Sequence, residues 1–134
     1  ALYAALSLAP GKKSFTTDIC VPISSLTKCI LETKKDLETS NIIAPIVGHV
    51  GDGNFHLILL LDPEDKDEVN EAKEINDRLI ARALKMGGTC TGEHGIGLGK
   101  KEHLRKEKGI SLDVMSQIKK ALDPNNIMNP GKIF

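Results

Sequence analysis

Two of the four histidines in the chain lie on either side of a turn motif. Apolar segments flank Asp52-Gly53, a dipeptide typical of tight β-hairpins. If Asp52 and Gly53 form a two-residue turn, His49 stands directly opposite His56, with the two Cβ atoms about 4.5–5.5 Å apart. Two imidazoles at that spacing can share one divalent cation, because each metal–nitrogen bond is only about 2.0–2.1 Å long. The alternative is a pair of structural histidines with separate polar partners.

A second candidate group lies in a glycine-rich passage, GEHGIG (92–97). Its glycines let the backbone approach a ligand closely. The Glu93 carboxylate could complete a site of two histidines and one carboxylate that leaves coordination positions open for a substrate. The side chain of His94 diverges from that of Glu93, so we expect it to stay off the ion and to accept a proton, a role that suits imidazole near neutral pH. The alternative is a plain glycine turn with an exposed acid–base pair.

Other catalytic motifs do not occur in the sequence. Residues 95–100, GIGLGK, fit neither the dinucleotide-binding nor the phosphate-loop pattern, and there is no HExxH, CxxC or GxSxG motif. The three cysteines, Cys20, Cys29 and Cys90, are odd in number and lack metal-ligand spacing, so we expect free core thiols and no disulfide. His103 lies in a charged stretch and is interpreted as a surface residue.

The sequence pattern around these side chains predicts strands and helices in the order of an α+β fold. The expected order is strand, helix, strand, strand, helix and a short final strand, which is the split βαβ pattern of a ferredoxin-like antiparallel sheet covered by helices. Period-2 alternation predicts the strands and helical spacing of apolar residues predicts the helices. The strands are expected at residues 15–21, 42–50, 55–62 and near 89–91, and the helices at 24–40 and 63–86, with additional C-terminal helices at 101–108 and 111–122.

The composition narrows the function classes. The chain has 134 residues, enough for a single domain (1–134), with 18 Lys+Arg against 18 Asp+Glu, three Phe, one Tyr and no Trp. Zero net charge and few aromatic rings suit nucleic acids poorly, and we expect no nucleic-acid partner. No apolar run approaches the roughly 20 residues that span a bilayer, and no export leader is visible. Because the chain opens at Ala1 in a helical pattern, we interpret it as a piece of a longer protein that could self-associate through an exposed apolar face.

Four segments of the sequence resemble a known family. They are GHVGDGNFH (48–56), TGEHGIGLGKK (91–101), LDPNNIMNPGKIF (122–134) and TTDICVPIS (16–24). Together they resemble the C-terminal cap domain of FAD-linked oxidases of the vanillyl-alcohol-oxidase type, near the branches of cytochrome-type D-lactate dehydrogenases, glycolate oxidase catalytic subunits and D-2-hydroxyglutarate dehydrogenases. The resemblance covers essentially the whole chain.

The resemblance implies a role for individual residues. His49, His56 and Glu93 match the ligands of a divalent cation, zinc or manganese in relatives, and His94 matches the general base. Asn54 matches a residue that hydrogen-bonds the substrate beside the flavin. Asn129 lies in a terminal stretch that returns to the flavin domain and is a second FAD-facing candidate. The FAD itself is expected to be held mainly by a preceding domain, which the chain lacks together with the substrate-clamping arginine.

The implied activity is oxidation of a D-2-hydroxy acid, with hydride transfer to FAD and electrons passed on to cytochrome c, a quinone or an electron-transfer flavoprotein. Thr16 stands where the 2-hydroxyglutarate branch is expected to carry a lysine, which favours a small monocarboxylate such as D-lactate; Leu2 leaves the choice of acid open. The isolated chain is expected to be inactive. The expected location is mitochondrial in a eukaryote, and cytoplasmic or at the inner membrane in a bacterium. The alternatives are a free-standing ferredoxin-like metal- or ligand-binding module and a hydrolase that uses metal-bound water.

Overall fold

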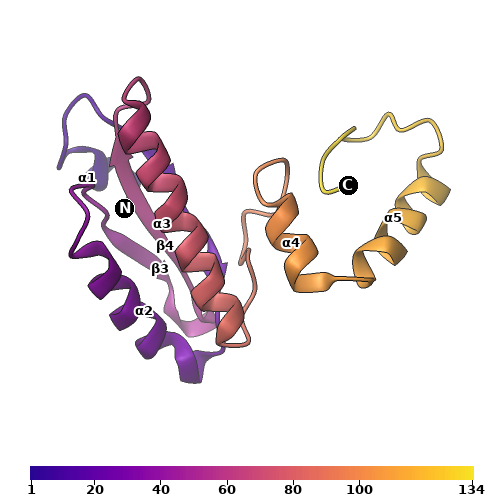
Figure 1. Cartoon of the computed structure of the whole chain (residues 1–134), viewed down its shortest axis with the longest axis horizontal. Helices are drawn as coiled ribbons and strands as arrows, with labels where there is room; N and C mark the ends of the chain where they lie inside the picture. Colours follow the sequence, from indigo (N-terminus) through magenta and orange to yellow (C-terminus); the bar gives the residue numbers. More distant parts are fainter. The chain divides into compact units, whose positions relative to one another are not determined.

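The chain forms two units, Ala1–Glu93 and His94–Phe134, and the computed structural model describes every residue of both, 1–134. The first unit is an antiparallel sheet with helices on both faces (Figure 1). Its strands are β1 (Lys13–Thr16), β2 (Ile19–Cys20), β3 (Ile46–His49) and β4 (Asn54–Leu61), and its helices are α1 (Leu2–Leu6), α2 (Ile23–Leu37) and α3 (Lys66–Lys85).

All eight residues of β4 are buried, because β4 is the central strand and both of its faces are covered. β1 and β2 pair with one edge of β4 and β3 pairs with the other. A bridge between Cys20 and Thr89 places the last expected strand position beside β2. The predicted α+β class, with an antiparallel sheet in split βαβ order, is confirmed.

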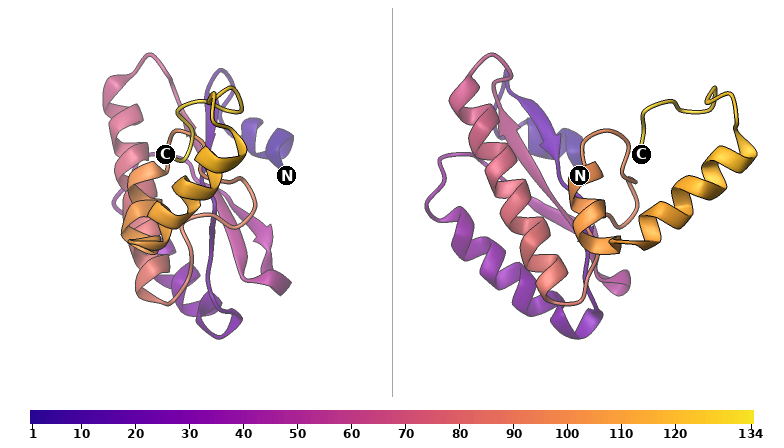
Figure 2. Two further views of the ribbon diagram at one scale, coloured as in Figure 1. Left: turned by 90° about the vertical axis from the view of Figure 1, so that its right-hand side faces the viewer. Right: turned by 45° about the vertical axis from the view of Figure 1, so that its right-hand side comes forward.

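Each face of β4 packs against a different helical layer. Ile58 and Leu60 pack against Ala5 of α1. Successive strand side chains point to opposite faces, so Leu57 and Leu59 point toward the layer formed by α2 and α3. Figure 2 shows α3 and α1 on opposite sides of the sheet. The short α1 covers only part of its face, and the candidate site lies farther along that same face.

The prediction of one continuous strand at residues 15–21 is wrong. The structure has two strands there, β1 and β2, separated by Thr17 and Asp18. The register is the same on both sides of the break, since Thr16 pairs with Ile58 and Ile19 pairs with Phe55. Within the break the N–H of Leu57 donates to the Thr17 hydroxyl at 2.8 Å. The continuous register places Asp18 opposite His56.

The two-residue hairpin turn is also wrong. Residues Val50–Asp52 form a 3-10 turn, η1, and Gly53 follows with a φ of 75°. His49 therefore pairs with Asn54, and the residue opposite His56 is Val47. A Cβ on Gly53 would lie 2.0 Å from the carbonyl oxygen of Val21, so this close approach requires glycine. Because the register differs from the expected one by an even number of residues, the two histidines still share one face of the sheet.

The second unit contains α4 (Lys101–Lys108) and α5 (Ser111–Leu122), both with the predicted bounds. The N–H of Ile133 donates to the carbonyl of Gly97 at 2.9 Å, which ties the end of the chain to the glycine-rich passage. None of the helices in the structure is both long and apolar enough to cross a lipid bilayer.

Asp123 organises the turn that follows α5. Its carboxylate accepts hydrogen bonds from the Lys119 ammonium and from the N–H groups of Ile127, at 3.0 Å, and Met128, at 2.9 Å. The Lys119 hydrogen bond, with smaller contributions from the two backbone donors, holds the pKa of Asp123 below its ordinary value. The turn therefore depends on the ionised carboxylate.

Acid is expected to release this turn. A carboxyl whose pKa is lowered by folding stabilises the folded state above its unfolded pKa of about 3.9, and this contribution is lost as the pH falls through the lower folded value. The amide chemical shifts of Ile127 and Met128 should move as Asp123 protonates, as measured by NMR. Asp123→Asn should give the acid-form shifts of these two amides already near neutral pH. Amide shifts in the variant that match those of the wild type would contradict the assignment.

Candidate active site

His56 of β4 and His49 of β3 both approach the carboxylate of Glu93, which lies in the loop after α3. Nε2 of His56 is 3.0 Å from Oε1 of Glu93, and Nε2 of His49 is 3.7 Å from Oε2. Glu93 thus presents one oxygen to each imidazole. The residues that the sequence analysis proposed as metal ligands are brought together on one face of the sheet.

The orientation of His56 is fixed through its other ring nitrogen. Nδ1 lies 2.9 Å from the carbonyl oxygen of Thr17. A carbonyl only accepts hydrogen bonds, so Nδ1 is the donor, and Nε2, on the side of Glu93, is the ring nitrogen available to a metal ion. Metal-binding histidines are commonly oriented in this way.

The separation between His56 and Glu93 fits a divalent cation, and His49 lies on the other oxygen of the same carboxylate. Two ligand atoms that each lie about 2.1 Å from one ion are about 3.0–3.4 Å apart in octahedral or tetrahedral coordination. The His56–Glu93 separation of 3.0 Å falls in that range. The His49–Glu93 separation of 3.7 Å is slightly longer, and the His49 side chain, 64% exposed, has room to turn inward. Two imidazoles and one carboxylate that face solvent on one side leave coordination positions open.

Asn54 lies beside these three candidate ligands and is buried. Its Nδ2 donates to Oδ1 of Asp18 at 2.8 Å and to the carbonyl of Ile19 at 2.7 Å. Its Oδ1 is buried without a hydrogen-bond partner. Buried acceptors are nearly always satisfied, so this oxygen is the natural place for a hydroxyl or amine donor that the chain does not provide.

Asp18 is the residue that the sequence analysis missed. Its side chain is 1% exposed and lies 3.6 Å from Nδ1 of His56. It also accepts hydrogen bonds from the loop that carries Glu93, as detailed below. Little in the sequence points to it, because residues 15–21 alternate β-branched and polar side chains, and a polar residue in such a strand is ordinarily exposed to solvent.

His49, Asn54 and Glu93 line a pocket together with Cys20, Asp52 and Gly92. Burial, followed by the nearby charges of Asp18 and Asp52, raises the pKa of the Cys20 thiol. Its Sγ lies 3.2 Å from the carbonyl of Asp52. Cys20 is therefore a neutral thiol in the pocket wall. All three cysteines are free, as predicted.

His94 and Asn129 belong to the second unit. His94 directly follows Glu93 and lines a pocket of that unit, as does Asn129. Asn129 has a φ of 48°, and its Oδ1 accepts a hydrogen bond from Lys132 at 3.3 Å. The roles expected for both residues remain predictions.

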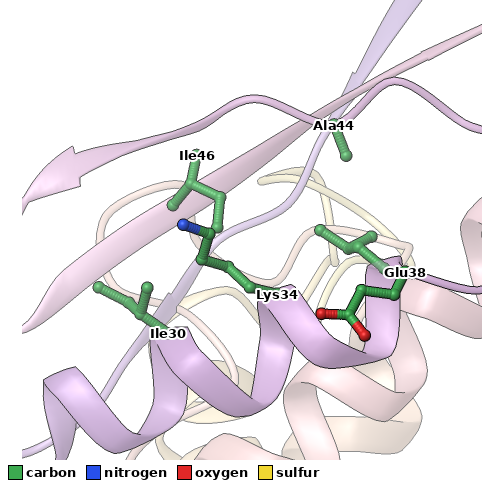
Figure 3. Close-up of a pocket in the computed structure, with 6 residues that line it drawn as sticks. Ile30, Lys34, Glu38, Ala44 and Ile46 are labelled. Atoms are coloured by element: carbon green, nitrogen blue, oxygen red, sulfur yellow. The ribbon is translucent and has the colours of Figure 1, made fainter.

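Another hollow lies between α2 and β3 (Figure 3). Its lining is mostly aliphatic, from Ile30, Leu37, Ala44 and Ile46. It contains no histidine or cysteine.

The chain is similar in sequence to known proteins. The family described as FAD linked oxidases, C-terminal domain, matches residues 1–133. The probable mitochondrial D-lactate dehydrogenase of Danio rerio is 58% identical over 100% of this chain and 27% of its own length. The mitochondrial D-lactate dehydrogenase (cytochrome) of Arabidopsis thaliana is 48% identical over 100% of this chain and 24% of its own length. The glycolate oxidase subunit GlcD of Bacillus subtilis is 36% identical over 87% of this chain and 25% of its own length. The chain spans about a quarter of the length of these curated relatives.

Proposed function

This chain belongs to the family of FAD-linked oxidase C-terminal domains, and on that premise we propose that it forms the metal- and substrate-binding cap of a longer flavin-dependent D-2-hydroxyacid dehydrogenase. The observation that carries the proposal is the approach of His49 and His56 to one carboxylate, Glu93, beside a buried amide oxygen without a partner. D-Lactate is the proposed substrate, because the relatives of highest identity described above are D-lactate dehydrogenases.

In this proposal His49, His56 and Glu93 hold a divalent cation, zinc or manganese. When bound, the cation supplies a Lewis acid for the substrate oxygens and the flavin supplies the hydride acceptor. Asn54 orients the substrate through its buried Oδ1, which accepts a hydrogen bond. His94 accepts the proton that leaves the substrate hydroxyl, so that the α-hydrogen can depart with its electron pair.

The FAD belongs mainly to the part of the protein outside this chain. Asn54 and Asn129 are the residues proposed to face it. Residues 1–134 alone are therefore proposed to be inactive.

The relatives also suggest an electron acceptor and a location. One carries "cytochrome" in its name and two are mitochondrial by name. For this protein we propose cytochrome c as the electron acceptor, ahead of a quinone or an electron-transfer flavoprotein. We propose the mitochondrion as its location in a eukaryotic source.

The test uses the full-length protein. It should be yellow, contain stoichiometric zinc or manganese by elemental analysis, and reduce an artificial acceptor faster with D-lactate than with glycolate or D-2-hydroxyglutarate. A metal-free protein with full activity would contradict the metal site. A clear preference for D-2-hydroxyglutarate would contradict only the substrate.

A further inference from the structure

We propose that Asp18 is a positioning residue for the metal ligands, because its buried carboxylate holds the loop that carries Glu93 and, through a second set of contacts, the amide of Asn54. This inference rests on the proposed function, since it concerns the same site.

Asp18 is connected to the loop by hydrogen bonds to its Oδ2. The Thr91 hydroxyl donates at 2.6 Å, the N–H of Gly92 at 2.8 Å and the N–H of Glu93 at 3.1 Å. Three successive residues of the loop are therefore tied to one carboxylate. The N–H of Glu93 belongs to the residue whose side chain meets both histidines, so the hydrogen bonds fix the starting point of that side chain.

The other oxygen of Asp18 faces the sheet. It accepts from Nδ2 of Asn54 at 2.8 Å and lies 3.6 Å from Nδ1 of His56. Because Nδ2 of Asn54 is held there, the Oδ1 of Asn54 must point the opposite way. One carboxylate thus links the loop, the side-chain amide of Asn54 that is proposed to bind the substrate, and the strand that carries His56.

The loop packs closely against Asp18 and Asn54, with no space for a larger residue at Gly92. Asp18 is fully buried, and a Cβ on Gly92 would lie 2.0 Å from Nδ2 of Asn54 and 3.0 Å from Oδ1 of Asp18. Only glycine allows the loop to come this close. The loop is therefore in direct van der Waals and hydrogen-bond contact with these two side chains.

The ionised carboxylate suits this role because it only accepts hydrogen bonds, and its bonds to N–H and O–H donors are charge-assisted. In Asp18→Asn the side chain keeps its shape, but one acceptor becomes an NH2 donor that faces other donors. If this NH2 faces the loop, the bonds from Thr91, Gly92 and Glu93 to Oδ2 are lost. If it faces Asn54, the bond from Nδ2 of Asn54 and the weaker 3.3 Å bond from the N–H of Glu93 are lost. Either way, Glu93 is held less firmly relative to His49 and His56.

The experiment measures the affinity of the metal-stripped full-length protein for Mn²⁺, by the electron paramagnetic resonance signal of the free ion. Changes to groups that orient metal ligands typically weaken binding by about 10- to 100-fold, and we expect this for Asp18→Asn. Excess Mn²⁺ should restore much of the kcat, because the ligands themselves are intact. Asp36→Asn is the matched control, since this carboxylate pairs with Arg78 and Arg82, away from the site; its Mn²⁺ affinity should be unchanged.

Thr91→Val provides a milder variant in case Asp18→Asn does not fold. It removes one donor to Asp18 and should weaken Mn²⁺ binding by about threefold. Wild-type affinity in folded Asp18→Asn, or in Thr91→Val where Asp18→Asn does not fold, would overturn the positioning role while leaving the metal site intact. A wild-type protein that does not bind Mn²⁺ or Zn²⁺ would overturn the proposed metal site, and the positioning role with it.

Discussion

Exchange of Glu93 for glutamine in the full-length protein is expected to remove the metal ion and to lower turnover at least about a hundredfold, while the flavin stays bound. Both oxygens of this carboxylate face imidazoles, so it is the central member of the ligand set. Glutamine keeps the size but loses the charge and one acceptor. Lewis-acid stabilisation is worth several kcal/mol, and each 1.36 kcal/mol corresponds to about tenfold in rate.

Three measurements on the same sample test this prediction: metal content by elemental analysis, flavin content by absorbance, and turnover of D-lactate. Glu74→Gln is the control, because Glu74 is an exposed carboxylate on α3 and makes only a 3.9 Å ion pair with Arg78. It should retain metal, flavin and rate. Full turnover by a metal-free Glu93→Gln protein would refute the role of the carboxylate.

The helices and the central strand were predictable because their determinants are local. α4 and α5 have the expected bounds, and β4 differs from its predicted range by one residue at each end. For α3 the side chain of Asp65 accepts from the N–H groups of Asp67 and Glu68, an N-terminal cap that lies close to the expected start. Apolar spacing and capping act within a few residues, so the sequence contains them directly.

The hairpin register was not predictable in the same way. Asp-Gly favours a two-residue turn, but Gly53 is held against the carbonyl of Val21, and the turn is longer. That contact joins segments far apart in the chain. The predicted histidine pair was therefore wrong as a directly opposed pair, yet the shared face was right, because side-chain direction depends only on whether the register shift is odd or even.

Asp18 was missed for a related reason. Its hydrogen-bond partners are 36 residues away at Asn54 and 74 residues away at Gly92. No spacing rule connects residues at such distances. A similar separation divides the histidines from Glu93, which the sequence analysis joined to them only by the chemistry of the side chains. The sequence therefore shows which residue types could form the site, but only the folded sheet brings them close together.

The chemistry of His94 separates a dehydrogenase cap from a domain that only binds metal. A metal-binding module needs the ligands alone, and its affinity would not depend on a neighbouring imidazole. A dehydrogenase also needs a group that takes the hydroxyl proton as hydride leaves. His94, next in the chain to Glu93 and outside the proposed ligand set, is the residue to which that task is assigned.

Replacement of His94 by glutamine is therefore expected to lower kcat by about a hundredfold to ten-thousandfold, the usual contribution of a general base, with metal and flavin content unchanged. In His94→Ala, added imidazole should restore part of the rate, because a free base can enter the space that is vacated. His103→Gln, on α4, is the control and should turn over D-lactate normally. If His94→Gln instead loses the metal, the residue is a ligand and not the base; if it keeps the full rate, another group accepts the proton.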